Sequence, residues 1–129
     1  MGKIFLIDDD EVFNLLSKIQ INLVVPDAEV VEFTSALAAL EFLNSNSSAG
    51  RDLPRFIFLD VRMPEMDGFG FLDAIESSIT LSALNIPIIM LTSSLHPADR
   101  KRAQSYKSIL EYWEKPLSIK DFEKIKDRL

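Results

Sequence analysis

The sequence predicts an α/β protein with a parallel sheet covered by helices on both faces. Short apolar runs alternate along the chain with longer segments whose apolar residues recur at helical spacing. The runs are continuously apolar rather than alternating, which is typical of parallel strands buried on both faces. Successive strand–helix units with right-handed crossovers then give a doubly wound, three-layer (βα)5 fold.

The first two units occupy the start of the chain. A strand at Ile4–Ile7 precedes a helix over about Glu11–Leu23, and Asp10 stands where an N-cap residue is expected. The helix is predicted from apolar residues at helical spacing, which are Val12, Leu15, Leu16, Ile19 and Leu23. Glu29–Phe33 is the second strand, and Ser35 caps a second helix. The residues expected to face inward from this second helix are Leu37, Leu40 and Leu43.

A polar loop without periodicity, Asn44–Asp52, separates these units from the next two. The third strand is the apolar run that ends at Asp60, Phe56–Asp60. The helix after it is lined by Phe69, Leu72 and Ile75. Ile88–Leu91 forms the fourth strand, and Pro97 opens a fourth helix over the charged stretch Asp99–Tyr106.

The fifth unit closes the chain. Ile109–Glu114 is the fifth strand, and Pro116 follows it. Ser118 and Asp121 have the spacing and side chains of a capping box, which marks the start of the final helix. The residues expected to face inward from it are Phe122, Ile125 and Leu129. With no internal repeat and no linker-like segment, the 129 residues are expected to form one domain, 1–129.

The composition narrows the classes of function. A net charge of −6 argues against direct contact with nucleic acid, because phosphate binding needs concentrated Lys and Arg. The chain has no cysteine and one histidine, His96, which excludes disulfides, thiolate zinc sites and multi-histidine metal sites. No apolar run has the length of a membrane span or a signal-peptide core, so we expect a cytoplasmic protein with no membrane partner.

Polar side chains stand at the carboxyl ends of four predicted strands. They are Asp8 and Asp9 after the first strand, Asp60 at the third, Thr92 at the fourth and Lys115 at the fifth. Because an open parallel sheet binds its ligands at this edge, we expect these groups to converge there. Mg²⁺ prefers oxygen ligands and commonly takes one or two carboxylates together with phosphate oxygens. The set therefore predicts a Mg²⁺-dependent phosphoryl site on an aspartate.

Each of these residues also has an ordinary structural interpretation when considered alone. Asp8 and Asp9 can form a solvated acidic turn, and Asp60 can be a turn acid before a proline. Thr92 can cap a helix, and a lysine such as Lys115 is commonly solvated. The combination, in this order and with each residue at a strand end, supports the functional interpretation.

Four motifs surround these residues: Ile7-Asp8-Asp9-Asp10, Leu59-Asp60-Val61-Arg62-Met63-Pro64 with Met66-Asp67-Gly68, Met90-Leu91-Thr92-Ser93 and Glu114-Lys115-Pro116. Together they resemble the receiver domain of two-component response regulators, over essentially the whole chain. The resemblance implies a flavodoxin-like sheet with strand order 2-1-3-4-5. It also implies a chemotaxis-regulator-like receiver, and we expect a stand-alone one because the chain ends on the final helix.

The resemblance implies a role for each acid. Asp60 resembles the phosphoacceptor, which takes a phosphoryl group from the phosphohistidine of a sensor histidine kinase or a histidine phosphotransfer protein. Asp8 and Asp9 resemble the Mg²⁺ ligands. Asp60 itself and the backbone carbonyl of Arg62 resemble the further metal contacts.

The resemblance also implies a switch. Thr92 and Lys115 resemble the groups that bind the transferred phosphoryl oxygens, and Tyr112 matches the switch aromatic of the family. A downstream protein is expected to bind the surface made by the fourth helix, the fifth strand and the fifth helix. The chain is expected to act as a phosphorelay switch and not as an enzyme, apart from its own phosphotransfer and autodephosphorylation.

The sequence departs from the family pattern in three places. Arg62 stands where an uncharged or acidic residue is frequent, and Lys107-Ser108-Ile109 stands near the place of a common Gly-Ala pair. The interval from Thr92 to Lys115 is one residue longer than expected. The last two departures predict an altered geometry of the fourth helix, and so of the output face, while the core of the site is intact.

Two alternative functions compete with the phosphorelay switch. One is a pseudo-receiver that binds partners without phosphorylation, against which the intact acids, Thr92 and Lys115 argue. The other is a phosphohydrolase with an aspartyl nucleophile, of the haloacid dehalogenase type. Such enzymes typically carry a second acid two residues after the nucleophile, where this chain has Arg62, and a cap domain that 129 residues do not accommodate.

Overall fold

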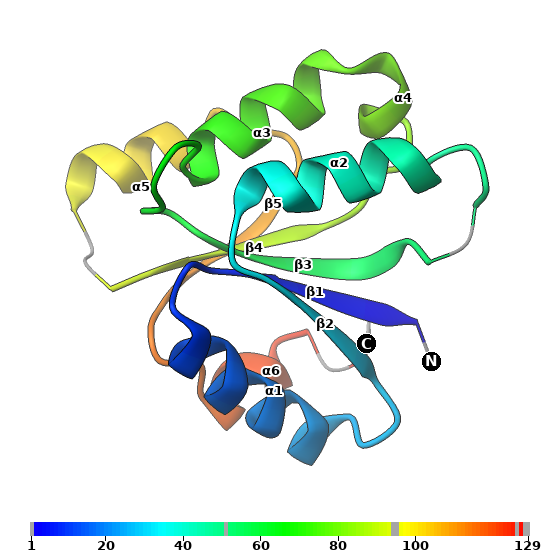
Figure 1. Ribbon diagram of the computed structural model, residues 1–129. Coiled ribbons are helices and arrows are strands. Elements are labelled where there is room, and N and C mark those ends of the chain that lie inside the picture. The colour runs from blue at the N-terminus through cyan, green and yellow to red at the C-terminus, as the bar shows by residue number, and fades with distance from the viewer. Residues whose placement is uncertain (1, 51, 94–95, 126, 128–129) are drawn as a thin grey trace.

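A computed structural model describes residues 2–50, 52–93, 96–125 and 127 of the chain. Its centre is a sheet of five parallel strands in the order β2-β1-β3-β4-β5 (Figure 1). The strands are β1 (Lys3–Ile7), β2 (Glu29–Phe33), β3 (Pro54–Asp60), β4 (Ile88–Thr92) and β5 (Ile109–Glu114). The predicted strand order is confirmed, and every predicted strand is present within two residues of its expected bounds.

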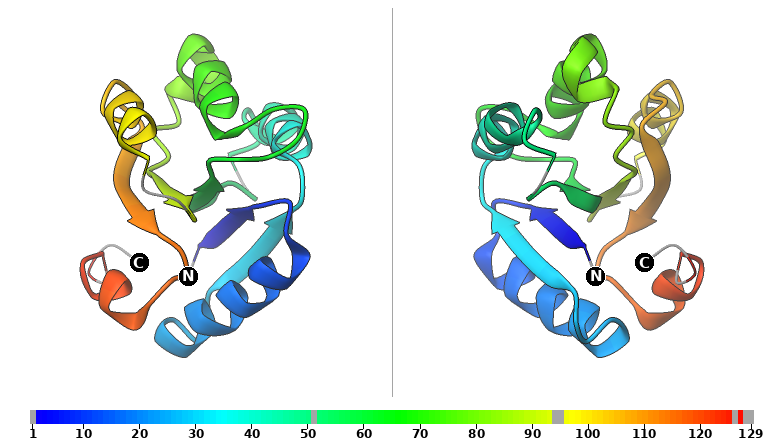
Figure 2. Two further views of the ribbon diagram at one scale, coloured as in Figure 1. Left: turned by 90° about the vertical axis from the view of Figure 1, so that its left-hand side faces the viewer. Right: turned by 90° about the vertical axis from the view of Figure 1, so that its right-hand side faces the viewer.

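Helices cover both faces of the sheet, which confirms the three-layer, doubly wound fold (Figure 2). On one face lie α1 (Glu11–Val24) and α6 (Ile119–Glu123). The other face carries α2 (Ala36–Asn46), α3 (Gly68–Ser77), α4 (Ile79–Ser82) and α5 (Pro97–Ala103). The short helix α4 lies in the connection from α3 to β4 and is not predicted by the sequence pattern, so the predicted fourth and fifth helices are α5 and α6.

Two apolar cores fill the spaces between the sheet and its helices. Phe5 and Phe69 belong to the core under α2, α3 and α5. Phe58, Trp113 and Phe122 pack against one another in the core under α1 and α6, with ring centroids 5.9–6.2 Å apart. Because successive strand residues point to opposite faces, a continuously apolar strand supplies both cores. This arrangement explains the uninterrupted apolar runs of the sequence.

The apolar stripe of α1 faces away from the core. Its side chains, which are 51–71% exposed, are Val12, Leu15, Leu16, Ile19 and Leu23. The buried side of the helix carries Asn14, Ser17 and Ile21 instead. The Asn14 side-chain amide donates a hydrogen bond to the Asp8 carbonyl (2.9 Å), which holds this polar side inward. The periodicity correctly predicts the helix, but periodicity alone does not determine which side of a helix meets the core.

Other details of the helices differ from the sequence expectations. Leu37 is exposed, so its predicted inward position is wrong; α2 approaches the sheet through the small side chains of Ala36 and Ala39, with Leu43 also buried. The helix also continues to its end at residue 46, into the predicted polar loop. The charged helix α5 ends at Ala103, before the predicted end at Tyr106. The sequence did not predict this end correctly because the residues of α5 have no apolar periodicity that defines a boundary.

The predicted N-terminal signals of the helices are confirmed. Asp10 caps α1, Ser35 caps α2, and Ser118 and Asp121 form both bonds of the capping box on α6. The inward side chains predicted for the final helix are buried at residues 122 and 125, whereas Leu129 lies outside the described residues. Within the described ranges, no helix has the length and apolar character needed to cross a membrane.

Candidate functional site

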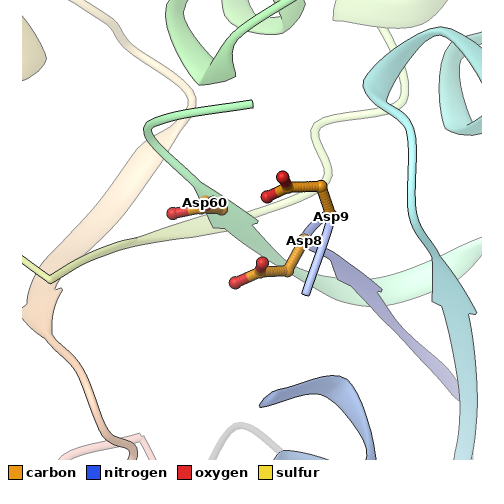
Figure 3. A group of neighbouring side chains, drawn as sticks. All are labelled: Asp8, Asp9 and Asp60. Atoms are coloured by element: carbon orange, nitrogen blue, oxygen red, sulfur yellow. The ribbon is translucent and has the colours of Figure 1, made fainter. Parts of the chain in front are cut away.

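The carboxyl ends of β1 and β3 bring three carboxylates together (Figure 3). Asp8 and Asp9 follow β1, and Asp60 is the last residue of β3. One oxygen of each carboxylate lies within 4.8 Å of the other two. Asp8 and Asp60 are buried, whereas Asp9 is exposed. The acids that the sequence placed at strand ends therefore form one group at this edge of the sheet.

Hydrogen bonds in the turn after β1 set the direction of the Asp8 side chain. The Asp8 amide donates to the Phe33 carbonyl of β2 (3.0 Å), which extends the sheet by one residue. The Asp10 amide donates to Asp8 Oδ1 (2.9 Å), and Asp10 itself accepts from two amides of the first turn of α1. The chain turns at this point, so Asp8 and Asp9 both reach the site although adjacent residues of a strand point apart.

The turn after β3 packs tightly against the backbone of Asp60. The Gly68 amide donates to the Val61 carbonyl (2.9 Å). A β-carbon at residue 68 would clash with the Asp60 carbonyl oxygen and approach the Met90 methyl group to 2.8 Å. Glycine is required here by the close approach of two backbone segments. Asp67 accepts from a backbone amide of α3 and so fixes where this helix begins.

Lys115 connects the acids to one another. Its Nζ atom lies 2.6 Å from Asp8 Oδ2 and 3.0 Å from Asp60 Oδ1. The ammonium also lies over the ring of Phe13, 4.3 Å from its centroid. Burial opposes the charged form, but the hydrogen bond to Asp8 and the charge of Asp60 outweigh it and raise the pKa of Lys115. This lysine is therefore part of the acidic group and not a solvated surface residue.

The surroundings of Asp60 oppose the ionisation of its carboxyl group. Burial, followed by the charge of Asp8, raises the pKa of Asp60 from 3.8 to about 6, although Lys115 offsets part of this increase. A cation bound among the acids favours the charged carboxylate. The oxygen donors and their spacing suit a hard divalent cation such as Mg²⁺, which forms few bonds to the protein and keeps several waters.

Thr92 and Tyr112 lie next to each other beside this group. Thr92 closes β4 and is buried, at the same edge as Asp60, which pairs with Leu91 in the sheet. Tyr112 pairs with Met90 and is half-buried against the core under α5. Burial raises the pKa of Tyr112, and its interaction with Thr92 offsets part of that increase. The Tyr112 hydroxyl is buried and neither accepts nor donates a hydrogen bond among the described residues, so it is available to respond to a change at Thr92.

Arg62 stands two residues after Asp60 and directs its side chain at α5. Its guanidinium forms an ion pair with Asp99 Oδ2, at 2.5 Å from Nη2. The Asp99 side chain is 14% exposed and that of Arg62 67%. The sequence departure at this position therefore creates a contact between the turn after β3 and the first turn of α5.

Three contributors to the site were missed by sequence reasoning. Phe13 lies under the ammonium of Lys115, Asn14 holds the Asp8 carbonyl, and Asp99 pairs with Arg62. Phe13 and Asn14 lie outside the apolar stripe of α1, where solvated side chains are ordinarily expected. Asp99 is 37 residues from Arg62 in sequence, so only the tertiary fold reveals the pair.

A parallel sheet in this strand order, with acids, a hydroxyl and a lysine at its carboxyl edge, defines a class of signalling domain that accepts a phosphoryl group on an aspartate. The response regulator receiver domain family matches residues 4–126. The chain belongs to this family, as the sequence motifs implied.

Two curated relatives match part of the chain. It is 40% identical over 87 residues to the Probable methanogenesis regulatory protein FilR2 of Methanothrix harundinacea (strain 6Ac), over 67% of this chain and 54% of that protein. It is 33% identical over 89 residues to the Sensor histidine kinase CheAY of Helicobacter pylori (strain ATCC 700392 / 26695), over 69% of this chain and 10% of that protein. The chain thus spans about half of the length of the first relative and a tenth of the second.

Solved structures of response regulators superpose on nearly the whole chain. A two component response regulator from Cytophaga hutchinsonii has a TM-score of 0.87 with 28% identity, and the match covers 98% of this chain and 94% of that one. The bacteriophytochrome response regulator RtBRR has a TM-score of 0.79 with 27% identity, covering 100% and 78%. The Mn²⁺-bound form of response regulator Rcp1 has a TM-score of 0.73 with 25% identity, covering 98% and 89%.

Family membership establishes the general function. Residues 4–126 are a receiver domain of two-component phosphorelay signalling, a domain that acts as a phosphoacceptor switch. Members of the family are generally signalling switches and not true enzymes, and they interact with histidine kinases and with downstream targets.

Proposed function

We propose that Asp60 is the phosphoacceptor and that residues 1–129 form one receiver domain. The position of Asp60 supports this assignment, because β3 is the central strand of the sheet. A phosphoryl group on Asp60 would therefore lie close to the acids that follow β1, to Lys115 and to Thr92 at the end of β4. The contact of Lys115 Nζ with Asp60 Oδ1 at 3.0 Å is the single observation that carries the proposal, since it places a cation on the acceptor oxygen.

The reaction is an in-line phosphoryl transfer from a phosphohistidine. A carboxylate oxygen of Asp60 attacks phosphorus, the P–N bond breaks as the P–O bond forms, and the imidazole nitrogen leaves with the bonding electron pair. With a pKa of about 6, Asp60 is mostly ionised at neutral pH, as this attack requires. Thr92 and Lys115 bind phosphoryl oxygens and stabilise the negative charge on them.

Mg²⁺ is the cofactor that we propose for this site. Asp8, Asp9, Asp60 and the backbone carbonyl of Arg62 would hold the ion, and three of these groups already present oxygens within 4.8 Å of one another. When bound, Mg²⁺ supplies positive charge that neutralises the phosphoryl oxygens and orients them.

The exposed apolar stripe of α1 is proposed as the docking surface of the phosphodonor, a sensor histidine kinase or a histidine phosphotransfer protein. A donor histidine must reach Asp60, so its protein must bind beside the carboxyl edge of the sheet. The stripe begins at Val12, close after the turn that carries the acids, and runs along the helix to Leu23. Contiguous exposed apolar side chains of this kind mark protein interaction sites.

The output surface is proposed to lie at the β5 edge of the sheet, formed by α5, β5 and α6. Phosphorylation draws the Thr92 hydroxyl toward a phosphoryl oxygen, and Tyr112 responds because the two side chains interact. The result is a shift between two conformations of this surface, which a downstream protein distinguishes.

The net charge of −6 disfavours nucleic acid as the direct target. A chain without cysteine is compatible with the cytoplasm.

The two alternatives fit the site less well. A receiver that is never phosphorylated would not need Lys115 between two buried acids. Burying these charges costs desolvation free energy, which a role in phosphoryl binding would justify. A phosphohydrolase of the haloacid dehalogenase type would need a second acid where Arg62 instead points to α5.

Incubation with acetyl phosphate and Mg²⁺ tests the acceptor. We expect the intact mass to rise by one phosphoryl group, hydroxylamine to remove it, and Asp60→Asn to abolish it. Asp27→Asn, a change at an exposed acid before β2, is the matched control and should behave as wild type. Stoichiometric phosphorylation of Asp60→Asn would show that another residue is the acceptor.

A further inference from the structure

The helix α5 is held in place mainly by charged side chains. Of its residues from Pro97 to Ala103, only Ala103 is buried. Arg100 lies over the ring of Tyr112, 5.6 Å from its centroid, and Arg102 lies over the ring of Phe69, 4.4 Å from its centroid. A short helix with so little apolar burial depends on these polar contacts for its position, and each of them is sensitive to nearby charge.

The ion pair between Arg62 and Asp99 differs from the other contacts of α5 because it ends on the turn that follows Asp60. Asp99 lies in the first turn of the helix and is largely removed from solvent, while most of the Arg62 side chain is exposed. The guanidinium is thus not packed in place and is free to exchange one anionic partner for another. Arg62, Asp99 and Arg100 all influence the pKa of Tyr112, so the pair and the switch aromatic belong to one cluster of charges.

We propose that the Arg62–Asp99 ion pair is the contact through which the charge on Asp60 controls the position of α5. The inference rests on the proposed function, in which Asp60 takes a phosphoryl group. That group adds up to two negative charges and three acceptor oxygens close to the turn. The new charge attracts the guanidinium of Arg62 and repels the carboxylate of Asp99, and both effects weaken the pair. Release of the first turn of α5 then also loosens Arg100 from the ring of Tyr112.

The two residues act on α5 as positioning residues. They supply a second route from Asp60 to the output surface, beside the route through Thr92. An ion pair of this exposure changes a local opening equilibrium by about two- to fivefold. A change of this size adjusts the response of the switch without abolishing phosphorylation.

Amide hydrogen exchange of α5 measured by NMR tests the proposal, with Mg²⁺ alone and with Mg²⁺ and beryllium fluoride, a phosphoryl mimic. In the resting protein, Arg62→Gln and Asp99→Asn should each speed exchange of the α5 amides by about two- to fivefold. The double variant should be no faster than either single variant, because both remove the same contact. With beryllium fluoride bound, wild type should exchange at the rate of the variants, and the substitutions should have little further effect.

A charge swap and a control on the same helix sharpen the test. The swap Arg62→Asp with Asp99→Arg should restore slow exchange in the resting protein, because an ion pair again joins the turn to α5. It should lose the response to beryllium fluoride, because the group on α5 is then attracted to the phosphoryl mimic and the group on the turn is repelled by it. Arg102→Gln, which removes the pair between Arg102 and Asp73 (3.8 Å), should speed exchange equally in both states. Additive single effects, or equal effects of Arg62→Gln in both states, would overturn the proposal.

Failure of the further inference is distinguishable from failure of the proposed function. Uptake of the phosphoryl group, measured by intact mass, reports the acceptor alone and should be retained in Asp99→Asn. If mass spectrometry shows no phosphorylation of wild type, the proposed function is wrong. If phosphorylation occurs but α5 exchange is unchanged by beryllium fluoride, the function stands and the coupling role of Arg62 is wrong.

Discussion

The ammonium of Lys115 lies closer to Asp8, at 2.6 Å, than to Asp60, at 3.0 Å. In the resting site the lysine therefore neutralises the neighbouring acid at least as much as the proposed acceptor. A cation bound among the acids would repel the ammonium from Asp8 and leave it to act on phosphoryl oxygens. The lysine and the metal ion are thus expected to compete in the resting state and to cooperate once a phosphoryl group is present.

Replacement of the lysine separates these two effects. Lys115→Met should bind Mg²⁺ more tightly than wild type, because a competing positive charge is removed. The same variant should be phosphorylated by acetyl phosphate at least about tenfold more slowly, because a cation that stabilises the transition state is lost. Calorimetric titration and intact-mass kinetics measure the two quantities, with Lys107→Met as the control at an exposed lysine. Weaker Mg²⁺ binding by Lys115→Met would contradict the proposed competition.

The raised pKa of Asp60 predicts how stability depends on pH. The folded-state pKa is about 6 and that of the unfolded chain is about 3.9. Between these values the folded protein keeps a proton that the unfolded chain has released, so the free energy of unfolding falls as pH rises. Metal-free Asp60→Asn should escape this loss and be more stable than wild type at neutral pH, by up to about 3 kcal/mol.

Urea unfolding of both proteins at about pH 4 and about pH 7, without metal, measures the effect. The difference between wild type and Asp60→Asn isolates this one group from the other acids of the chain. A variant that is less stable than wild type at neutral pH would mean that Asp60 is stabilised as a carboxylate, contrary to its surroundings.

The proposed coupling between Thr92 and Tyr112 predicts which variant uncouples the switch. Thr92→Ala should still be phosphorylated but should lose most of the conformational response, since no hydroxyl joins the phosphoryl group to the tyrosine. Chemical shifts of Tyr112 and its neighbours on β5, recorded with and without beryllium fluoride and Mg²⁺, report that response. Thr92→Ser, which keeps the hydroxyl, should retain most of it. Equal shift changes in wild type and Thr92→Ala would show that the signal takes another route.

The exposed stripe of α1 predicts a variant that affects one donor and not another. Leu16→Glu should slow phosphotransfer from a phosphorylated histidine protein by about tenfold or more, because it places a charge in the apolar contact with the donor. Transfer from acetyl phosphate, which needs no docking, should be unchanged. Ile79→Glu on α4, where the side chain is 90% exposed, is the matched control. Equal loss with both donors would point to damage at the site and not at a docking surface.

Much of the fold and site follows from local sequence. The apolar run of β3 ends where a polar residue appears, so Asp60 marks the end of this strand as well as the site, and Lys115 directly follows β5. The caps at Asp10 and Ser118 are equally local, because each depends on residues within one turn. These features were predictable because they need no knowledge of distant parts of the chain.

The features that escaped prediction depend on the tertiary fold. The stripe of α1 has the helical spacing of a buried face, but Asn14 bonds to the backbone of Asp8 and turns the opposite face inward. The pair between Arg62 and Asp99 joins two segments that are distant in sequence and meet only when α5 lies over the end of β3. Neither relationship has a periodicity or a motif that reveals it.

The alternation of side chains along β5 has a spectroscopic consequence. Tyr112 contacts the core under α5, together with Tyr106, whereas Trp113 lies in the core under α1 and α6. These are the only tyrosines and the only tryptophan of the chain. The two layers of the molecule therefore carry different native chromophores. Selective excitation of tryptophan observes the side on which a phosphodonor is proposed to bind, and tyrosine difference absorption observes the side of the switch, without any added label.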